Sequence, residues 1–210
     1  MRNAVEMVYD EIRSDLDSLD LVLWKSGDKL AKLIQWGTAS DYTHVGMVVR
    51  FPGDIVMLWE STFDNVSSGV RLIPLSKALQ DEDVYIRRAT SSNREGIFDR
   101  LMAVRKELDG RPFENNVLEF ICAAYDGPGG DNKRNITSLF CSELIAETLI
   151  QIGLMDGRTP SNEYTPRDFG DDGKLPLIGL KYEKSIRVKR NVTAQSAKTF
   201  NKAKVMLPQS

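Results

Sequence analysis

The chain has 210 residues, which is enough for one domain with a substantial hydrophobic core. With 41% hydrophobic residues, 28% charged residues and a formal net charge of −2, it is typical of a globular protein and lacks the basic excess of a nucleic-acid-binding domain. Two cysteines and a single histidine make no disulfide framework and leave too few ligands for a zinc site, so we expect no metal and no other cofactor.

The N-terminal segment predicts an amphipathic helix. Apolar residues recur there at helical spacing among acidic ones, at Val5, Val8, Tyr9, Ile12 and Leu16. Because acidic residues interrupt it, the segment is not an apolar run of the signal-peptide type, and no other stretch is long enough to span a membrane. We therefore expect a cytoplasmic protein.

Short apolar runs bounded by turn residues predict the strands. They lie at residues 19–24, 45–50, 55–61, 70–75, 84–86 and 182–189. Between the second and third runs, Phe51-Pro52-Gly53-Asp54 predicts a β-hairpin. A turn at residues 26–28 is expected to start a helix that ends at Gly37.

A capping box from Ser92 to Glu95 predicts the start of another helix. Its apolar stripe consists of Ile97, Leu101, Val104 and Leu108. The apolar stretch 117–125 is compatible with a further helix, in which Cys122 is a core residue. We expect residues 1–190 to form one domain and residues 191–210 a polar, mobile tail.

The last predicted helix begins near Cys141, after a glycine-rich loop at residues 127–134. A thiol at a helix start lies beside unpaired backbone N–H groups and the positive end of the helix dipole. Both features favour the thiolate, which makes Cys141 a candidate nucleophile. The alternative is a small buried core cysteine.

His44 is the only histidine, so it is the one candidate base for Cys141; the alternative is a packed or surface histidine. A three-residue hairpin loop, either 51–53 or 52–54, puts Glu60 directly opposite His44 or one diagonal step away, on the same face. A two- or four-residue loop puts the two side chains on opposite faces, which leaves Glu60 an exposed strand carboxylate.

Together these three residues are the types that acyl transfer by a thiol requires. Cys141 is the nucleophile, His44 the base, and Glu60 the group that orients the imidazole. The Cys141 backbone N–H is a candidate for stabilising the oxyanion. Tyr42, two residues before His44, is a candidate hydrogen-bond donor or substrate wall, with a packed aromatic ring as the alternative.

Three segments in this order carry a family resemblance: Tyr42-Thr43-His44-Val45-Gly46-Met47, Trp59-Glu60 and Phe140-Cys141-Ser142-Glu143-Leu144. They resemble the circularly permuted branch of the NlpC/P60 papain-like superfamily, in particular the YiiX/YaeF-type permuted amidases, whose relatives include poxvirus proteins and the lecithin retinol acyltransferase group. The resemblance covers residues 19–169. Leu19 stands where a glycine often precedes the aspartate of the opening strand, and Phe113 where a tyrosine is common; we expect these departures to affect packing more than chemistry.

The resemblance implies an α+β, circularly permuted papain-like fold, in which an antiparallel sheet packs against the helix that carries the nucleophilic cysteine. It also implies the roles of nucleophile for Cys141, base for His44 and third member for Glu60. The expected activity is cofactor-free hydrolysis of an amide or ester in a peptide, small-molecule or lipid substrate, through an acyl-thioester on Cys141. The alternatives are an acyltransferase acting on lipid acyl groups and a non-catalytic binding or structural module.

A basic segment near the C-terminus bears on the lipid alternative. It consists of Lys181, Lys184, Arg187, Lys189 and Arg190. Such a segment could make a weak contact with an anionic membrane. A solvated strand edge is the alternative.

Overall fold

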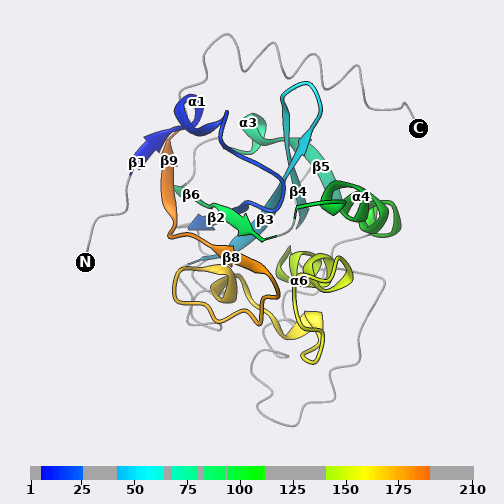
Figure 1. The fold of residues 1–210 in the computed structure, drawn as a ribbon. Helices are drawn as coiled ribbons and strands as arrows, with labels where there is room; N and C mark the ends of the chain where they lie inside the picture. The colour runs from blue at the N-terminus through cyan, green and yellow to red at the C-terminus, as the bar shows by residue number, and fades with distance from the viewer. Residues whose placement is uncertain are drawn as a thin grey trace.

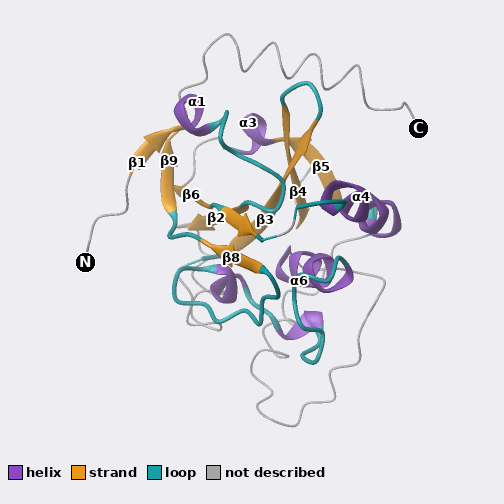
Figure 2. Ribbon diagram, viewed as in Figure 1, coloured by secondary structure: helices purple, strands orange, loops and turns teal. Residues whose placement is uncertain are grey.

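The computed structural model describes residues 6–25, 42–63, 68–79, 83–92, 94–111 and 141–189. Within these ranges the chain forms an α+β arrangement around a seven-stranded, mostly antiparallel sheet with strand order β1-β9-β6-β2-β3-β4-β5 (Figures 1 and 2). The strands of this sheet are β1 (Glu6–Val8), β2 (Leu21–Lys25), β3 (His44–Phe51), β4 (Ile55–Phe63), β5 (Ser68–Pro74), β6 (Asp83–Arg87) and β9 (Ile186–Lys189). A second, two-stranded sheet pairs β7 (Ala89–Ser91) with β8 (Leu180–Tyr182).

Helices cover both faces of the large sheet (Figure 1). They are α1 (Tyr9–Ile12), α3 (Leu75–Ala78), α4 (Ile97–Leu108) and α6 (Cys141–Gln151), and two 3-10 turns follow at Ser161–Glu163 and Pro166–Phe169. None of the helices in the described ranges is long and apolar enough to cross a membrane. The expected elements at residues 26–37, 117–125, 127–134 and 191–210 lie outside the described residues.

Two apolar clusters on opposite faces of the sheet form the core. Alternation along β3 sends Val45, Met47 and Val49 into the cluster under α4 and α6, whereas Val48 faces the cluster that contains the apolar residues of α1 and α3. The predicted stripe of α4 is confirmed, because all four of its residues are buried. The predicted helix that carries Cys141 is confirmed as well, as α6.

Two predictions at the N-terminal ends of helices are wrong. Residues Glu6–Val8 form strand β1, which pairs in parallel with β9, and only Tyr9–Ile12 is helical. The edge of β9 offers the backbone of Glu6–Val8 hydrogen-bond partners that an isolated short helix lacks. The predicted capping box is also absent: α4 begins after Gly96, and the Ser92 hydroxyl donates a hydrogen bond to the Gly179 carbonyl oxygen, 3.3 Å away.

The single strand predicted at residues 182–189 is in fact two strands, β8 and β9, in different sheets. The break lies at residues 183–185, where side chains bind the backbone. The Arg87 Nε donates to the Glu183 carbonyl oxygen at 2.9 Å, and the Asp171 carboxylate accepts both the backbone N–H and the hydroxyl of Ser185. These contacts replace the ladder hydrogen bonds that a continuous strand would make.

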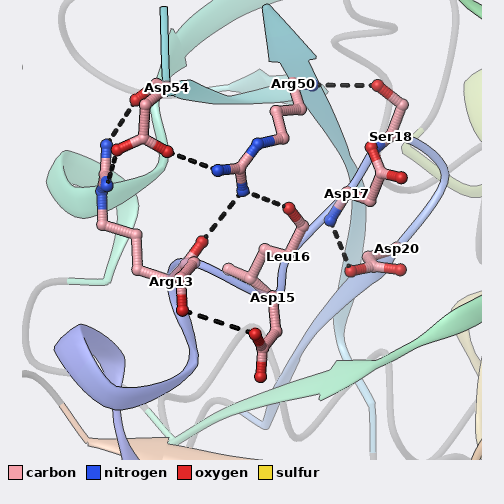
Figure 3. Close-up of polar contacts among 9 residues, drawn as sticks. Arg13, Asp15, Leu16, Asp17, Ser18, Asp20, Arg50 and Asp54 are labelled. Atoms are coloured by element: carbon pink, nitrogen blue, oxygen red, sulfur yellow. Dashed lines mark hydrogen bonds and ion pairs between the residues drawn. The ribbon is translucent and has the colours of Figure 1, made fainter.

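The β3–β4 hairpin, which positions the candidate site, has a loop at residues 52–54, because Phe51 pairs with Ile55. Asp54 ends the loop in a left-handed conformation with φ of 63°. Its carboxylate binds the guanidinium groups of Arg13 and Arg50, and Arg50 also donates to the carbonyl oxygens of Arg13 and Leu16 (Figure 3). The segment before β2 therefore holds the loop, and with it the register of the hairpin.

Candidate active site

Strands β3 and β4 bring His44 and Glu60 together. The pairing of Met47 with Trp59, continued by one step, places Glu60 across from Gly46 and one diagonal step from His44. This is the 52–54 form of the predicted three-residue loop, so the expectation of a shared face is confirmed. His44 Nε2 lies 2.8 Å from Glu60 Oε2, and Glu60 is buried, with 4% of its surface exposed.

Helix α6 places its first residue, Cys141, over the start of β3. The His44 ring and the backbone N–H groups of Val45 and Ser142 lie close enough to the thiol to interact with it electrostatically. Since Glu60 occupies Nε2 of His44, Nδ1 is the ring nitrogen left for the thiol. The three predicted catalytic side chains thus form one line across three elements: Cys141 from α6, His44 from β3 and Glu60 from β4.

The pairing of β3 with β4 ends before it reaches the first residues of β3. The β3–β4 ladder stops at the pair Met47 and Trp59, although β3 itself begins at His44. The backbone of residues 44–46 is therefore not paired with β4, and the Val45 N–H is available to the Cys141 sulfur. The strands still approach closely at Gly46, where a Cβ atom would lie 2.6 Å from Leu58 Cδ1.

Burial and charge act in opposite directions on the ionisable groups of this line. Burial by itself raises the pKa of Cys141, but the charge and hydrogen bond of His44, with the N–H groups of Val45 and Ser142, lower that pKa below its ordinary value. Burial likewise disfavours a charged His44, yet Cys141 and Glu60 raise the pKa of His44 above its ordinary value. The site therefore favours a thiolate and imidazolium pair.

Glu60 has a second partner that the sequence analysis missed, Arg71 on β5. Its Nε and Nη2 atoms lie 3.0 and 2.9 Å from Glu60 Oε1. His44 and then Arg71 lower the pKa of Glu60 against the effect of burial. The sequence did carry one signal for this contact: Arg71 is the single charged residue in the apolar run 70–75, which predicted the strand. The ring of Trp24, 4.9 Å from the His44 ring between centroids, was also missed as a site neighbour.

Tyr42 lies just before β3 and is packed among other side chains. Its ring meets the Tyr85 ring edge-on at 5.8 Å between centroids, and Lys25 Nζ lies 4.8 Å from its centroid. The Tyr42 hydroxyl is 3.5 Å from Ser185 Oγ. The ring thus matches the packed-aromatic alternative, and a role of the hydroxyl in binding an oxyanion stays a prediction.

Two further features bear on ligands and partners. Among the described residues, no group of three or more His, Cys, Asp or Glu side chains could hold a metal ion. In the basic segment, Arg187 forms ion pairs with Asp83 and Glu6, and Lys189 Nζ lies 2.6 Å from a Glu6 carboxylate oxygen. Part of the positive charge considered for membrane contact is therefore already paired within the fold.

No family model matches the chain. No curated protein matches it either. The structure is similar to the crystal structure of metalloprotein yiiX from Escherichia coli O157:H7, with a TM-score of 0.49 and 17% sequence identity over 86% of this chain and 90% of that chain. A TM-score of this size does not transfer a fold, a metal or an activity from one protein to the other.

Proposed function

We propose that the protein is a cysteine hydrolase that cleaves an amide or ester bond through an acyl-thioester on Cys141. The observation that carries the proposal is the line from the Cys141 thiol through the His44 ring to the Glu60 carboxylate. Each member has the partner that its role requires: a nucleophile beside a base, and a base whose other nitrogen binds a carboxylate.

In this reaction the Cys141 thiolate attacks the carbonyl carbon of the substrate and forms a C–S bond. The His44 imidazolium donates its proton to the leaving nitrogen or oxygen as the bond to that atom breaks, which leaves the acyl group on Cys141. Neutral His44 then takes a proton from water while the water oxygen attacks the thioester. The C–S bond breaks, the acid product leaves, and the thiolate and imidazolium are restored.

The start of α6 offers a place for the oxyanion that forms at each attack. The first backbone N–H groups of a helix have no partner within the helix, and the helix dipole is positive at this end. The backbone N–H of Cys141 is one of these groups, and it is attached to the nucleophile itself. We propose it as one oxyanion donor, with the Tyr42 hydroxyl as a candidate for a second.

We also propose that the fold is the circularly permuted NlpC/P60 papain-like arrangement. Its support is internal to the chain. The histidine lies on a strand of an antiparallel sheet, the cysteine begins a helix packed on that sheet, and the strand precedes the helix in sequence. The motifs around His44, Glu60 and Cys141 occur in the matching order.

The test is the rate of alkylation by iodoacetamide between pH 4 and 10, with the labelled cysteine located by mass spectrometry. We expect selective labelling of Cys141 with an apparent pKa well below the value of about 8.5 for a free thiol. His44→Gln, which keeps a side chain of similar size, should move this pKa back toward the free-thiol value. The denatured protein gives the reference rate for both cysteines.

Substrate chemistry is tested with p-nitrophenyl esters and anilides of increasing acyl length. We expect p-nitrophenol release, with an acyl adduct on Cys141 that mass spectrometry detects and that is absent in Cys141→Ala. Labelling of Cys141 only after denaturation would reject the hydrolase and leave a binding or structural module. Transfer of the acyl group to an added amine or alcohol in preference to water would reassign the protein as an acyltransferase.

A further inference from the structure

We infer that Arg71 is a positioning residue for the proposed reaction: it holds one oxygen of the Glu60 carboxylate so that the other oxygen faces His44. The inference rests on the proposed function, because a positioning residue needs a reaction to serve. Its test measures only the hydrogen bond between His44 and Glu60 and does not require activity. No part of the nucleophile, base and carboxylate pattern requires an arginine, and the evidence for it lies in the contacts of strand β5.

The sheet register brings Arg71 to Glu60. The two residues are directly paired across the β4–β5 ladder, which places their Cβ atoms about 5 Å apart. Two nitrogen atoms of the guanidinium, Nε and Nη2, both bind Glu60 Oε1. Oε2 is then free to bind His44 Nε2 at 2.8 Å. Each carboxylate oxygen therefore has a different partner, from a different neighbouring strand.

Because the Glu60 carboxylate is buried, each of its two oxygens needs a donor from the protein. The Glu60 side chain is 5% exposed, so a carboxylate oxygen without a donor cannot turn to water without leaving its place. The charged groups that act on the Glu60 carboxyl are His44 from β3 and Arg71 from β5. Arg71 is 27% exposed, so its guanidinium lies near the surface of the sheet.

The line has four alternating charges: the Cys141 thiolate, the His44 imidazolium, the Glu60 carboxylate and the Arg71 guanidinium. Without the last, the cluster carries a net negative charge in a buried place, and Oε1 loses both of its donors. The orientation of the carboxylate toward His44 is then less stable. An exposed ion pair of ordinary type would not have this consequence, because water replaces the lost partner.

The single histidine allows a direct test by nuclear magnetic resonance. In the Cys141→Ala background, the proton on His44 Nε2 reports its hydrogen bond to Glu60 through its chemical shift and its exchange rate with water. At pH 7 the chemical shift and exchange rate of this proton are compared among the parent protein, which has Arg71, and the variants Arg71→Lys and Arg71→Met. Arg100→Met, a change at an exposed position of α4, is the matched control for loss of an arginine.

We expect Arg71→Met to accelerate exchange of the Nε2 proton by about tenfold or more, as loss of a hydrogen bond between charged groups implies. Arg71→Lys should lie between Arg71→Met and the parent, and Arg100→Met should match the parent. Exchange rates in Arg71→Met and Arg71→Lys that both equal the parent rate would overturn the inference. Since Cys141 is absent from this experiment, failure of the hydrolase proposal in the alkylation assay and failure of the Arg71 inference are separate results.

Discussion

His44 Nε2 lies 2.8 Å from Glu60 Oε2 although the two residues are diagonal neighbours and not opposed across the β3–β4 ladder. Diagonal neighbours are about 7–8 Å apart, with their Cβ atoms somewhat closer, and the Glu60 side chain spans this distance. The register that brings the two side chains to one face is the one with the loop at residues 52–54.

Glu60→Asp and Glu60→Gln separate the reach of this side chain from its charge. Glu60→Gln keeps the reach but removes the charge that helps to raise the pKa of His44, so we expect alkylation of Cys141 near neutral pH to slow, though less than in His44→Gln. Glu60→Asp keeps the charge but shortens the side chain by one methylene, which draws the carboxylate away from both His44 and Arg71, and we expect it to resemble Glu60→Gln. Identical rates in wild type and all three variants would remove Glu60 and His44 from the mechanism.

Gly46 is required by the close approach of β3 and β4 beside the site. A Cβ atom there would lie 2.6 Å from Leu58 Cδ1 and 3.2 Å from the Trp59 carbonyl oxygen. We expect Gly46→Ala to lower the free energy of unfolding by about 1–3 kcal/mol, the usual cost of overpacking. Urea denaturation of the variant measures this cost.

The double variant Gly46→Ala with Leu58→Ala is the control for this mechanism. Removing the Leu58 side chain removes the shorter of the two clashes, so the cost of Gly46→Ala should fall in the Leu58→Ala background. Additive costs would show that the leucine contact is not the cause and that the Trp59 backbone sets the limit.

The features of the site that sequence predicts are those with a local signal. The turn Phe51-Pro52-Gly53-Asp54 predicts the hairpin, and apolar periodicity after Cys141 predicts the helix α6, so short stretches of sequence are enough to find the candidate nucleophile and the candidate base. The sequence does not decide between a loop at residues 51–53 and one at residues 52–54. That choice depends on contacts between Asp54 and Arg13, which are far apart in sequence.

The missed features depend on pairing between distant segments. Arg71 lies beside Glu60 only because β5 pairs with β4 in one particular register. Strand β1 exists because β9 offers it an edge, and β8 is separate from β9 because Arg87 and Asp171 bind the backbone between them. No local propensity distinguishes these outcomes from a longer helix or a continuous strand.

Leu19 combines a buried side chain with a backbone conformation that suits glycine. Its φ is 80°, and the side chain is fully buried. The choice of residue at this position thus concerns the backbone as well as packing. Truncation of the side chain should cost about 2–5 kcal/mol, whereas release from the left-handed conformation should return about 1 kcal/mol.

The comparison of Leu19→Ala with Leu19→Gly tests this assignment. Both variants lose the leucine side chain, but only glycine relieves the backbone, so we expect Leu19→Gly to be the more stable of the two in urea denaturation. At most other positions the order is the reverse. A more stable Leu19→Ala would mean that the positive φ carries little strain here.

Asp20, the next residue, should give the protein a distinctive pH dependence of stability. Its carboxylate accepts hydrogen bonds from the backbone N–H groups of Ala89 and Asp17 and lies 3.0 Å from Arg88 Nε. Burial is the stronger effect and raises the pKa of Asp20 to about 6. In the unfolded chain the pKa of an aspartate is about 3.9, so between these values the folded protein binds the proton that the unfolded chain has lost.

The stability due to this proton is therefore complete below about pH 4 and is lost as the pH rises through about 6. For a shift of about 2 pKa units the loss is about 3 kcal/mol. The asparagine side chain of the Asp20→Asn variant cannot titrate. We therefore expect the unfolding free energy of wild type, minus that of the variant, to fall by about 3 kcal/mol between pH 4 and pH 7. Urea denaturation at unit steps of pH measures the difference, in which the other titrating groups cancel. A difference that stays constant, or one that grows in favour of wild type, would mean that Asp20 is already ionised in the folded protein at pH 4 and that its two backbone donors and the charge of Arg88 outweigh its burial.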